Sequence, residues 1–261
     1  MDNNLLRFIK GFFVVRWKPG KDLVVVAISW LLVVASLYTA TVIVGAEIGG
    51  GIPYFLLYAI VTATFFGIGL PVFWMVFKQK RPISDLGITT KNLVLSLILQ
   101  VIFTIIVLPG GFAELEIPPF AELLPIICLA LTIGFFEAVF WRGWVLQRLE
   151  EAFGFIPAAL LGSALYAAYH IGYDMPLDEM LFLFFIGLMY AIAFRITGSI
   201  FILWPVFQPG GQLITLVKEG LSLPLLASVG FLEVFIVMVV LIWLSSRYLK
   251  KSRKKTVNGT S

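Results

Sequence analysis

The stretch that decides the fold is residues 123–146, LLPIICLALTIGFFEAVFWRGWVL, an apolar run that contains one carboxylate and one guanidinium. A helix needs about 20 mostly apolar residues to cross the hydrocarbon core of a bilayer, and this run is long enough. Lipid offers no partner to backbone N–H and C=O groups, so the run must be helical. Glu137 and Arg142 are therefore predicted to lie inside a membrane-spanning helix.

The composition of the whole chain favours a membrane protein. Of its 261 residues, 60% are hydrophobic and 13% are charged, whereas a soluble domain usually carries about 25% charged residues. This composition excludes a soluble enzyme, a disordered chain and a disulfide-stapled secreted module. The chain has one His and one Cys, which excludes a metal site built from several His or Cys ligands.

Apolar runs follow one another along the chain, so we predict an all-α fold, a polytopic membrane helix bundle of about eight transmembrane helices. The chain divides into a basic N-terminal arm (residues 1–22), a transmembrane domain (residues 23–246) and a basic tail (residues 247–261). The predicted spans are Leu23–Ala46, Ile52–Phe77, Leu93–Pro109, Pro119–Leu146, Phe155–Tyr173, Met180–Phe194, Ile200–Val217 and Leu223–Ser245.

Charges are sorted by side of the membrane. With eight crossings, both termini lie on the same side of the membrane. Of the 19 Lys and Arg residues, 18 lie on that side or nearer to it than to the other, and only Lys218 does not. The positive-inside rule makes that side the cytoplasm. We expect an integral, multi-pass protein of a prokaryotic cell membrane with both termini cytoplasmic. The acidic residues in or beside the outside connections are Glu47, Glu114, Glu116, Glu122, Asp174, Asp178, Glu179 and Glu219.

The basic tail predicts an anchor to anionic lipid rather than a nucleic-acid site. It carries six of the basic residues directly after the last apolar run. The lipid bilayer is therefore an expected partner, and nucleic acid is not.

The fourth and fifth spans form a helical hairpin whose turn is predicted at Gly154. Glu137 lies 17 residues before this glycine, and His170, the only histidine, lies 16 residues after it. At 1.5 Å per residue, both side chains sit ~25 Å from the turn, near the bilayer middle. They are a candidate general acid/base pair; the alternative is a polar bridge that only ties the two helices together. Tyr166 shares the helix face of His170 and either orients the ring or packs.

Two further ionisable residues lie within apolar runs, where insertion costs roughly 2.5–3.5 kcal/mol each. Arg142 follows Glu137 by five residues, about 140° around a regular helix, so a direct pair is disfavoured. Arg142 either pairs across helices, with Glu233 of the last span as one candidate partner, or extends to the inner headgroups. Both residues are candidates for structural or electrostatic support.

The seventh predicted span contains the polar stretch QPGGQ at residues 208–212. Pro209 removes a backbone hydrogen bond, so the helix is expected to kink or open there. Broken helix at membrane depth is tolerated only against protein or a water-filled cavity. Gln208 and Gln212 are thus predicted to donate amide N–H groups into a polar chamber between the fourth, fifth and seventh spans. The alternative is a kinked helix that only packs.

Three stretches resemble motifs of the CPBP (CAAX protease and bacteriocin-processing) intramembrane endopeptidases, which include the Ras-converting type of CAAX prenyl endopeptidase. Residues 136–143, FEAVFWRG, resemble the motif Glu-Glu-x-x-x-Arg-Gly, and residues 166–170, YAAYH, resemble Phe-x-x-x-His. Residues 208–212 stand where the family has His-x-x-x-Asn/Asp. The resemblance covers roughly residues 120–215.

The resemblance implies an eight-helix bundle with a polar cavity reached from the membrane. Glu137 would activate a water with help from His170, and Gln208 and Gln212 would stand where the oxyanion donors belong, with Tyr166 as a further substrate-binding candidate. The substrate would be a membrane-anchored protein or peptide, cleaved near the cytoplasmic side.

The chain departs from the family pattern at two positions, because Ala138 replaces the second Glu and Gln208 replaces the third-motif His. A zinc ion would have only Glu137, His170 and weak amide ligands, so we expect no metal and no other cofactor. Two functions stay open: a glutamate-dependent intramembrane endopeptidase, or a catalytically impaired CPBP-like protein acting in partner binding, immunity or complex assembly. A small transporter is disfavoured because no inverted repeat is visible.

Overall fold

The computed structural model describes residues 11–44, 51–113 and 115–258, with side chains as far as Arg253, and every regular element in these ranges is a helix. The predicted all-α membrane bundle is thereby confirmed. Several expectations lie outside the described residues: the end of the first span at Ala46, the basic residues Arg7 and Lys10, and the acidic residues Glu47 and Glu114.

Six helices in the described ranges are long and apolar enough to cross a membrane. Several of them join α-helical and π-helical or 3-10 turns without a break. They comprise α2 (Lys21–Tyr38) with η1 (Thr39–Ile43); α3 (Ile52–Phe55), η2 (Leu56–Gly69), α4 (Leu70–Val72) and η3 (Phe73–Lys78); α7 (Phe120–Glu137), η5 (Ala138–Leu146) and α8 (Gln147–Phe153); α9 (Phe155–Ala168) with η6 (Tyr169–Tyr173); α10 (Leu177–Thr197); and α12 (Ala227–Asn258).

The two remaining predicted spans are shorter than expected. The third is α5 (Leu93–Val107), followed by the single turn α6 (Pro109–Phe112). The seventh is divided into η7 (Ile200–Ile202) and α11 (Phe207–Lys218). Pro209 lies in the first turn of α11, where a helix has no use for the missing N–H. The predicted kink at Pro209 is therefore wrong, because the break lies upstream of it.

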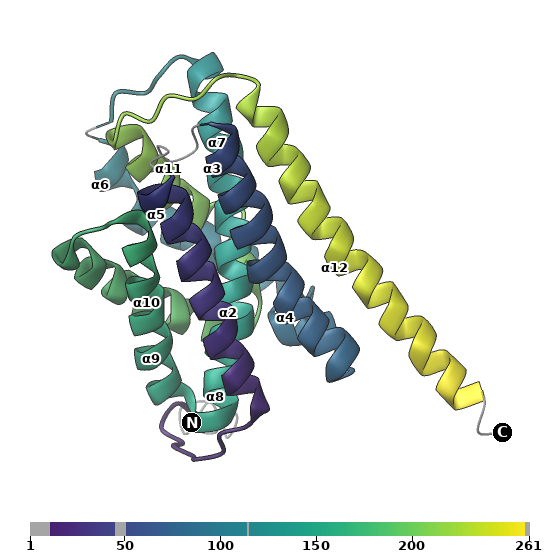
Figure 1. Cartoon of the computed structure of the whole chain (residues 1–261). Coiled ribbons are helices and arrows are strands. Elements are labelled where there is room, and N and C mark those ends of the chain that lie inside the picture. Colours follow the sequence, from purple (N-terminus) through teal and green to yellow (C-terminus); the bar gives the residue numbers. More distant parts are fainter. Residues whose placement is uncertain (1–10, 45–50, 114, 259–261) are drawn as a thin grey trace.

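The segment α7–η5–α8 forms the centre of the bundle (Figure 1). Its apolar window is 72% buried, compared with 28% for the first span and 22% for α12. α12 packs on α7 near its start and leans away from the other helices toward its C-terminal end (Figure 1). The start of α2 and the end of α12 lie at the same end of the bundle (Figure 1).

Gly154 forms the turn between α8 and α9, as predicted, with a φ of +87°. The backbone N–H groups of Arg16 and Lys18 donate to the carbonyls of Phe153 and Ala152, at 3.1 and 2.9 Å. These carbonyls belong to the last turn of α8 and have no partner within the helix. A Cβ at Gly154 would collide with the carbonyl oxygen of Val14, so this position admits only glycine.

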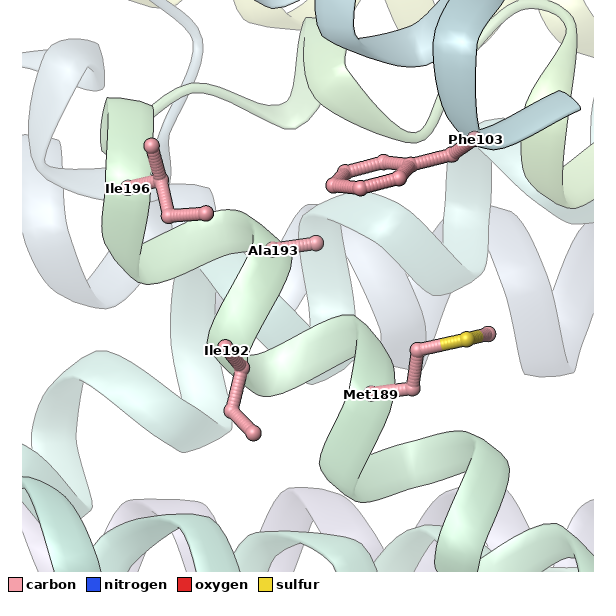
Figure 2. Close-up of a pocket in the computed structure, with 5 residues that line it drawn as sticks. All are labelled: Phe103, Met189, Ile192, Ala193 and Ile196. Carbon is pink, nitrogen blue, oxygen red and sulfur yellow. The ribbon is translucent and has the colours of Figure 1, made fainter. Parts of the chain in front are cut away.

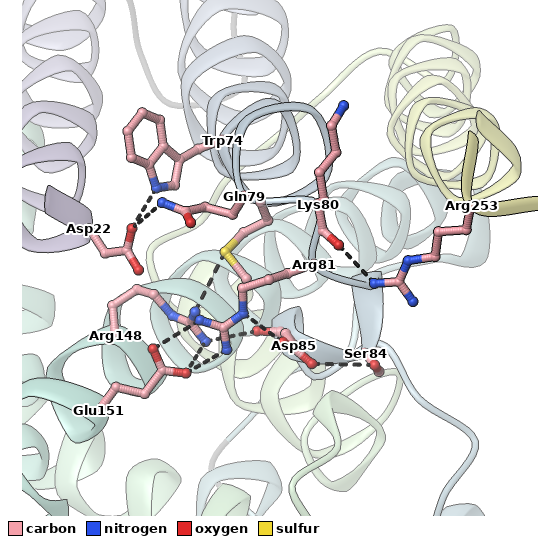
Figure 3. Close-up of polar contacts among 11 residues, drawn as sticks. Asp22, Trp74, Gln79, Lys80, Arg81, Ser84, Asp85, Arg148, Glu151 and Arg253 are labelled. Atoms are coloured by element: carbon pink, nitrogen blue, oxygen red, sulfur yellow. Dashed lines mark hydrogen bonds and ion pairs between the residues drawn. The ribbon is translucent and has the colours of Figure 1, made fainter. Parts of the chain in front are cut away.

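An ionic cluster ties the connection after η3, which includes η4 (Ile83–Leu86), to α8 (Figure 3). Arg81 pairs with Asp85 at 2.7 Å and with Glu151 at 2.6 Å. The same Glu151 oxygen lies 3.0 Å from the guanidinium of Arg148, whose side chain is fully buried. The Glu151 and Asp85 carboxylates raise the pKa of Arg81 above its ordinary value. The cluster thus fixes the end of the second span to the end of the segment α7–η5–α8.

We predict that Gly154→Ala lowers the melting temperature of the purified protein in detergent. A positive φ costs a residue with a Cβ at least about 1 kcal/mol, and the collision with Val14 adds to this. Gly20→Ala is the matched control, because Gly20 has an ordinary φ of −132° and open space around it. Equal melting temperatures for the two variants would contradict the packing of the N-terminal arm on α8.

Candidate active site

Glu137 lies at the junction of α7 and η5 and is only 3% exposed. One carboxylate oxygen, Oε1, accepts a hydrogen bond of 2.7 Å from the Tyr169 hydroxyl. The other, Oε2, accepts from Nε2 of Gln208 at 2.7 Å and from Nε2 of Gln212 at 3.0 Å. An ionised carboxylate has about four acceptor sites, so these three bonds leave one site, and the Tyr166 side chain also lies near the carboxylate.

Gln208 and Gln212 occupy one face of α11, four residues apart. A carboxylate can only accept, which fixes the amide nitrogen of each glutamine toward Glu137. Each amide nitrogen carries two hydrogens, and the contact with Glu137 uses one of them. Both predicted chamber residues therefore meet the predicted base directly, and each keeps one N–H group for another acceptor.

His170 lies in η6 with 7% of its surface exposed. Its Nδ1 is 2.9 Å from the backbone carbonyl oxygen of Tyr166. A carbonyl only accepts, so Nδ1 carries the proton and Nε2 presents a lone pair. The carbonyl of Tyr166, rather than its hydroxyl, orients the ring. Among the described residues, no hydrogen bond joins His170 to Glu137.

The contact expected from His170 is made instead by its neighbour, Tyr169. The rings of Tyr169 and His170 lie 4.3 Å apart. The Tyr169 hydroxyl, which bonds Glu137, is also 3.3 Å from that of Tyr173, and Tyr173 donates to Tyr58 at 3.0 Å. A row of phenols thus extends from the carboxylate to η2. The sequence contained one indication of this row of phenols. Tyr169 and Tyr173 are four residues apart and lie near the depth of Glu137, so they could have been predicted to share a helix face there.

Arg142 is 2% exposed and lies between two tyrosine rings. Its guanidinium carbon is 5.2 Å from the ring centre of Tyr166 and 5.7 Å from that of Tyr190, within cation–π range. Glu233 is exposed on α12. Arg142 therefore interacts across helices, as one of the two predicted arrangements has it, but its partners are tyrosine rings and not Glu233. The alternative, extension to the headgroups, is wrong because the side chain is buried.

The π-helical turns of η5 account for the position of Arg142. Hydrogen bonding from i to i+5 widens the turn and brings residues five apart toward one face. Arg142 consequently lies close enough to Glu137 for their charges to interact, with no direct ion pair between them in the described structure. The angle of 140°, which assumes a regular α-helix, does not apply here.

Glu137, Tyr169, His170 and Gln212 line one cavity of about 440 Å³ between α5, α7, α9, η6, α10 and α11. Exposed carboxylates also line it: Asp174, Glu179 and Glu219. Burial, and then the charge of Glu179, raise the pKa of Glu219. The cavity joins the buried base to a water-accessible acidic rim.

The acidic rim lies at the end of the bundle opposite the N-terminal arm. The arm packs on Phe153 beside Gly154, and α9 with η6 runs 19 residues from there to Tyr173, directly before Asp174. If the termini are cytoplasmic, the opening faces the other side of the membrane. The expectation of cleavage near the cytoplasmic side disagrees with this placement.

A second cavity, of about 350 Å³, lies beside the first between α5 and α10 (Figure 2). Its lining is entirely apolar: Phe103, Met189, Ile192, Ala193 and Ile196. Met189 lines both cavities, and Ile192 is 49% exposed. The polar chamber therefore adjoins an apolar recess on the outside of the bundle.

The donors around Glu137 are a phenol and two amides, which are not the groups that zinc prefers. In the described ranges, no three His, Cys, Asp or Glu side chains gather in a way that could hold a metal ion.

Comparison with protein families matches residues 119–207 to the family described as type II CAAX prenyl endopeptidase Rce1-like. The matched segment is about a third of the chain, so the similarity is to that segment. It holds Glu137, Arg142, Tyr166 and His170 and ends just before Gln208. Neither the curated proteins nor the solved structures contain a match to the chain. The resemblance to the CPBP endopeptidases is thus confirmed over residues 119–207, and the glutamine pair lies beyond the matched segment.

We predict that Tyr169→Phe destabilises the protein more than Tyr173→Phe. The first variant leaves Oε1 of Glu137 without its donor, and a hydrogen bond to a charged group is worth about 1.5–3 kcal/mol. The second removes only contacts between neutral hydroxyls. Unfolding of the reconstituted protein by denaturing detergent measures both free energies. An equal loss in the two variants would contradict the role of Tyr169 as a ligand of the carboxylate.

Proposed function

We propose that the chain is a CAAX-protease-like intramembrane endopeptidase that hydrolyses peptide bonds of membrane-anchored substrates with a water activated by Glu137. One observation carries this proposal: three donors hold the buried carboxylate in a cavity that His170 and Gln212 share. The similarity of residues 119–207 to the Rce1-like endopeptidases supports peptide-bond hydrolysis as the reaction.

The chemical roles follow from which lone pairs and hydrogens remain unused. A water donates one hydrogen to the free acceptor site of Glu137 and the other to Nε2 of His170, which orients it. Glu137 takes the proton as the water oxygen attacks the scissile carbonyl carbon. The second N–H groups of Gln208 and Gln212 donate to the oxyanion. Glu137 then delivers its proton to the leaving amine, so the C–N bond breaks and the base is restored.

Substrate access is proposed from the two cavities. An apolar anchor or span of the substrate lies against the recess at Met189 and Ile192, while its peptide reaches the chamber. We further propose that residues 23–246 span the membrane and that residues 1–22 and 247–261 are cytoplasmic, as the distribution of basic residues indicates. The acidic rim then admits the substrate from the opposite face.

A second candidate function is that of a catalytically impaired protein that uses the same chamber for binding or complex assembly. It is favoured by Ala138, which is fully buried next to Glu137 and brings no second carboxylate to the chamber. It is also favoured by Gln208, because an amide cannot relay protons as an imidazole does.

The two candidates predict different results for the purified protein in liposomes with a panel of lipid-anchored fluorogenic peptides. For an endopeptidase, Glu137→Gln and His170→Ala each reduce cleavage by at least about 100-fold, the usual contribution of a general base. Tyr38→Phe is the matched control, because this tyrosine at the end of α2 is exposed and does not line the chamber. A strong chelator is expected to leave the rate unchanged.

Equal cleavage by wild type, Glu137→Gln and His170→Ala would refute the endopeptidase mechanism. If none of the three cleaves any peptide of the panel and a well-folded Glu137→Gln keeps the cellular phenotype, the binding role replaces the proposed activity.

A further inference from the structure

α12 presents two different faces along its length. One face packs against α7 and the second span, and its residues recur every three or four positions: Ser228, Phe231, Val234, Met238, Ile242, Ser245 and Leu249. The opposite face is exposed and apolar with the same spacing, and it includes Val229, Ile236, Val240 and Leu244, each 44–53% exposed.

Glu233 lies within this exposed face, nearer to the start of α12 than to Arg247. It is four residues after Val229, three before Ile236 and seven before Val240, so the four side chains form one stripe. Glu233 is exposed, and among the described residues none forms an ion pair or hydrogen bond with it. The stripe is thus a row of apolar side chains with one unpaired carboxylate.

The position of Glu233 along α12 places it within the apolar part of the span. Six residues separate it from Ala227, where the helix begins, which corresponds to ~9 Å. Fourteen residues separate it from Arg247, the first basic residue of the tail, which corresponds to ~21 Å. The apolar segment between Ala227 and Arg247 therefore matches a hydrocarbon core of ~30 Å, and Glu233 lies inside that core.

A carboxylate at this depth needs a donor, because lipid tails supply none and ionisable residues in spans face a protein partner or water. Glu137 shows how this chain meets that need inside the bundle, with three donors. None of the described residues donates to Glu233, so its donor comes from another molecule.

We propose that the exposed stripe of α12 is a docking surface for a transmembrane helix of a different protein, which carries a Lys or Arg at the depth of Glu233. Charge complementarity defines this occupant. The stripe and its exposed neighbour Val237 offer apolar side chains for van der Waals packing with a second helix. The proposal does not depend on proteolytic activity.

A second copy of this chain is a poorer occupant. Twofold packing of α12 on α12 would place the two Glu233 carboxylates against each other, and like charges repel. Arg142, the cation at the middle of a span, is buried under Tyr166 and Tyr190 and cannot reach another copy.

The test measures association in the membrane between the labelled full chain and labelled synthetic helices, by energy transfer in phosphatidylcholine liposomes. One probe is a Leu-rich helix of about 20 residues with a single Lys at the depth of Glu233. The second probe has norleucine in place of that Lys. We expect at least tenfold tighter association of the Lys helix with wild type, and Glu233→Gln should abolish the difference.

Asp178→Asn is the matched control, because Asp178 is an exposed acid at the start of α10, away from α12 (Figure 1), and it should leave the tenfold difference intact. Equal association of the two helices with wild type would overturn the proposal, and this comparison needs no variant of the protein. Energy transfer between two copies that Glu233→Gln removes would also overturn it, in favour of a homodimer.

Discussion

The burial of the Glu137 carboxylate is the constraint on which the rest of this structure depends. A charge in the middle of a membrane bundle is tolerated only where donors replace water. Three donors do so here, one from η6 and two from α11. These bonds hold α7, η6 and α11 together around one point, so the same interactions that make the carboxylate tolerable also build the chamber.

The three hydrogen bonds to Glu137 do not use every acceptor site of the carboxylate or every N–H group of the two glutamines. One acceptor site of the carboxylate, one N–H of each glutamine and the Nε2 lone pair of His170 remain unused. These four groups are complementary to a water and a polarised carbonyl. Apolar side chains such as Leu108, Ile133 and Phe207 line the chamber together with these groups, while the carboxylates lie at its rim. The low local dielectric at depth strengthens each of these polar interactions.

The sequence was sufficient to predict the helical hairpin and its turn, because membrane helices have a fixed rise and only glycine suits the backbone at Gly154. It also placed Glu137, His170 and Gln212 in one chamber, whereas Gln208 bonds Glu137 without lining the cavity. The partner of Glu137 was missed: depth matching selects a layer of the membrane, and within that layer Tyr169 rather than His170 points at the carboxylate.

Two other differences between the predicted and the observed structure also arise from local backbone geometry. The position of Arg142 depends on π-helical turns, which shift the face of every residue that follows and leave no mark in the hydrophobic pattern. The length of α11 depends on where the backbone breaks, and a proline in a first turn leaves the helix intact. Hydrophobic periodicity identifies a span but does not resolve these local choices.

The most direct measurement of the role of Glu137 uses a lipid-anchored peptide that the protein cleaves. A single turnover is run in ¹⁸O-enriched water, and both the product and the protein are then analysed by mass spectrometry. If Glu137 activates a water, the new carboxyl group of the product gains one ¹⁸O and the Glu137 carboxylate gains none. Label in Glu137 together with an unlabelled product would show that Glu137 itself attacks the peptide bond, and would contradict the proposed mechanism.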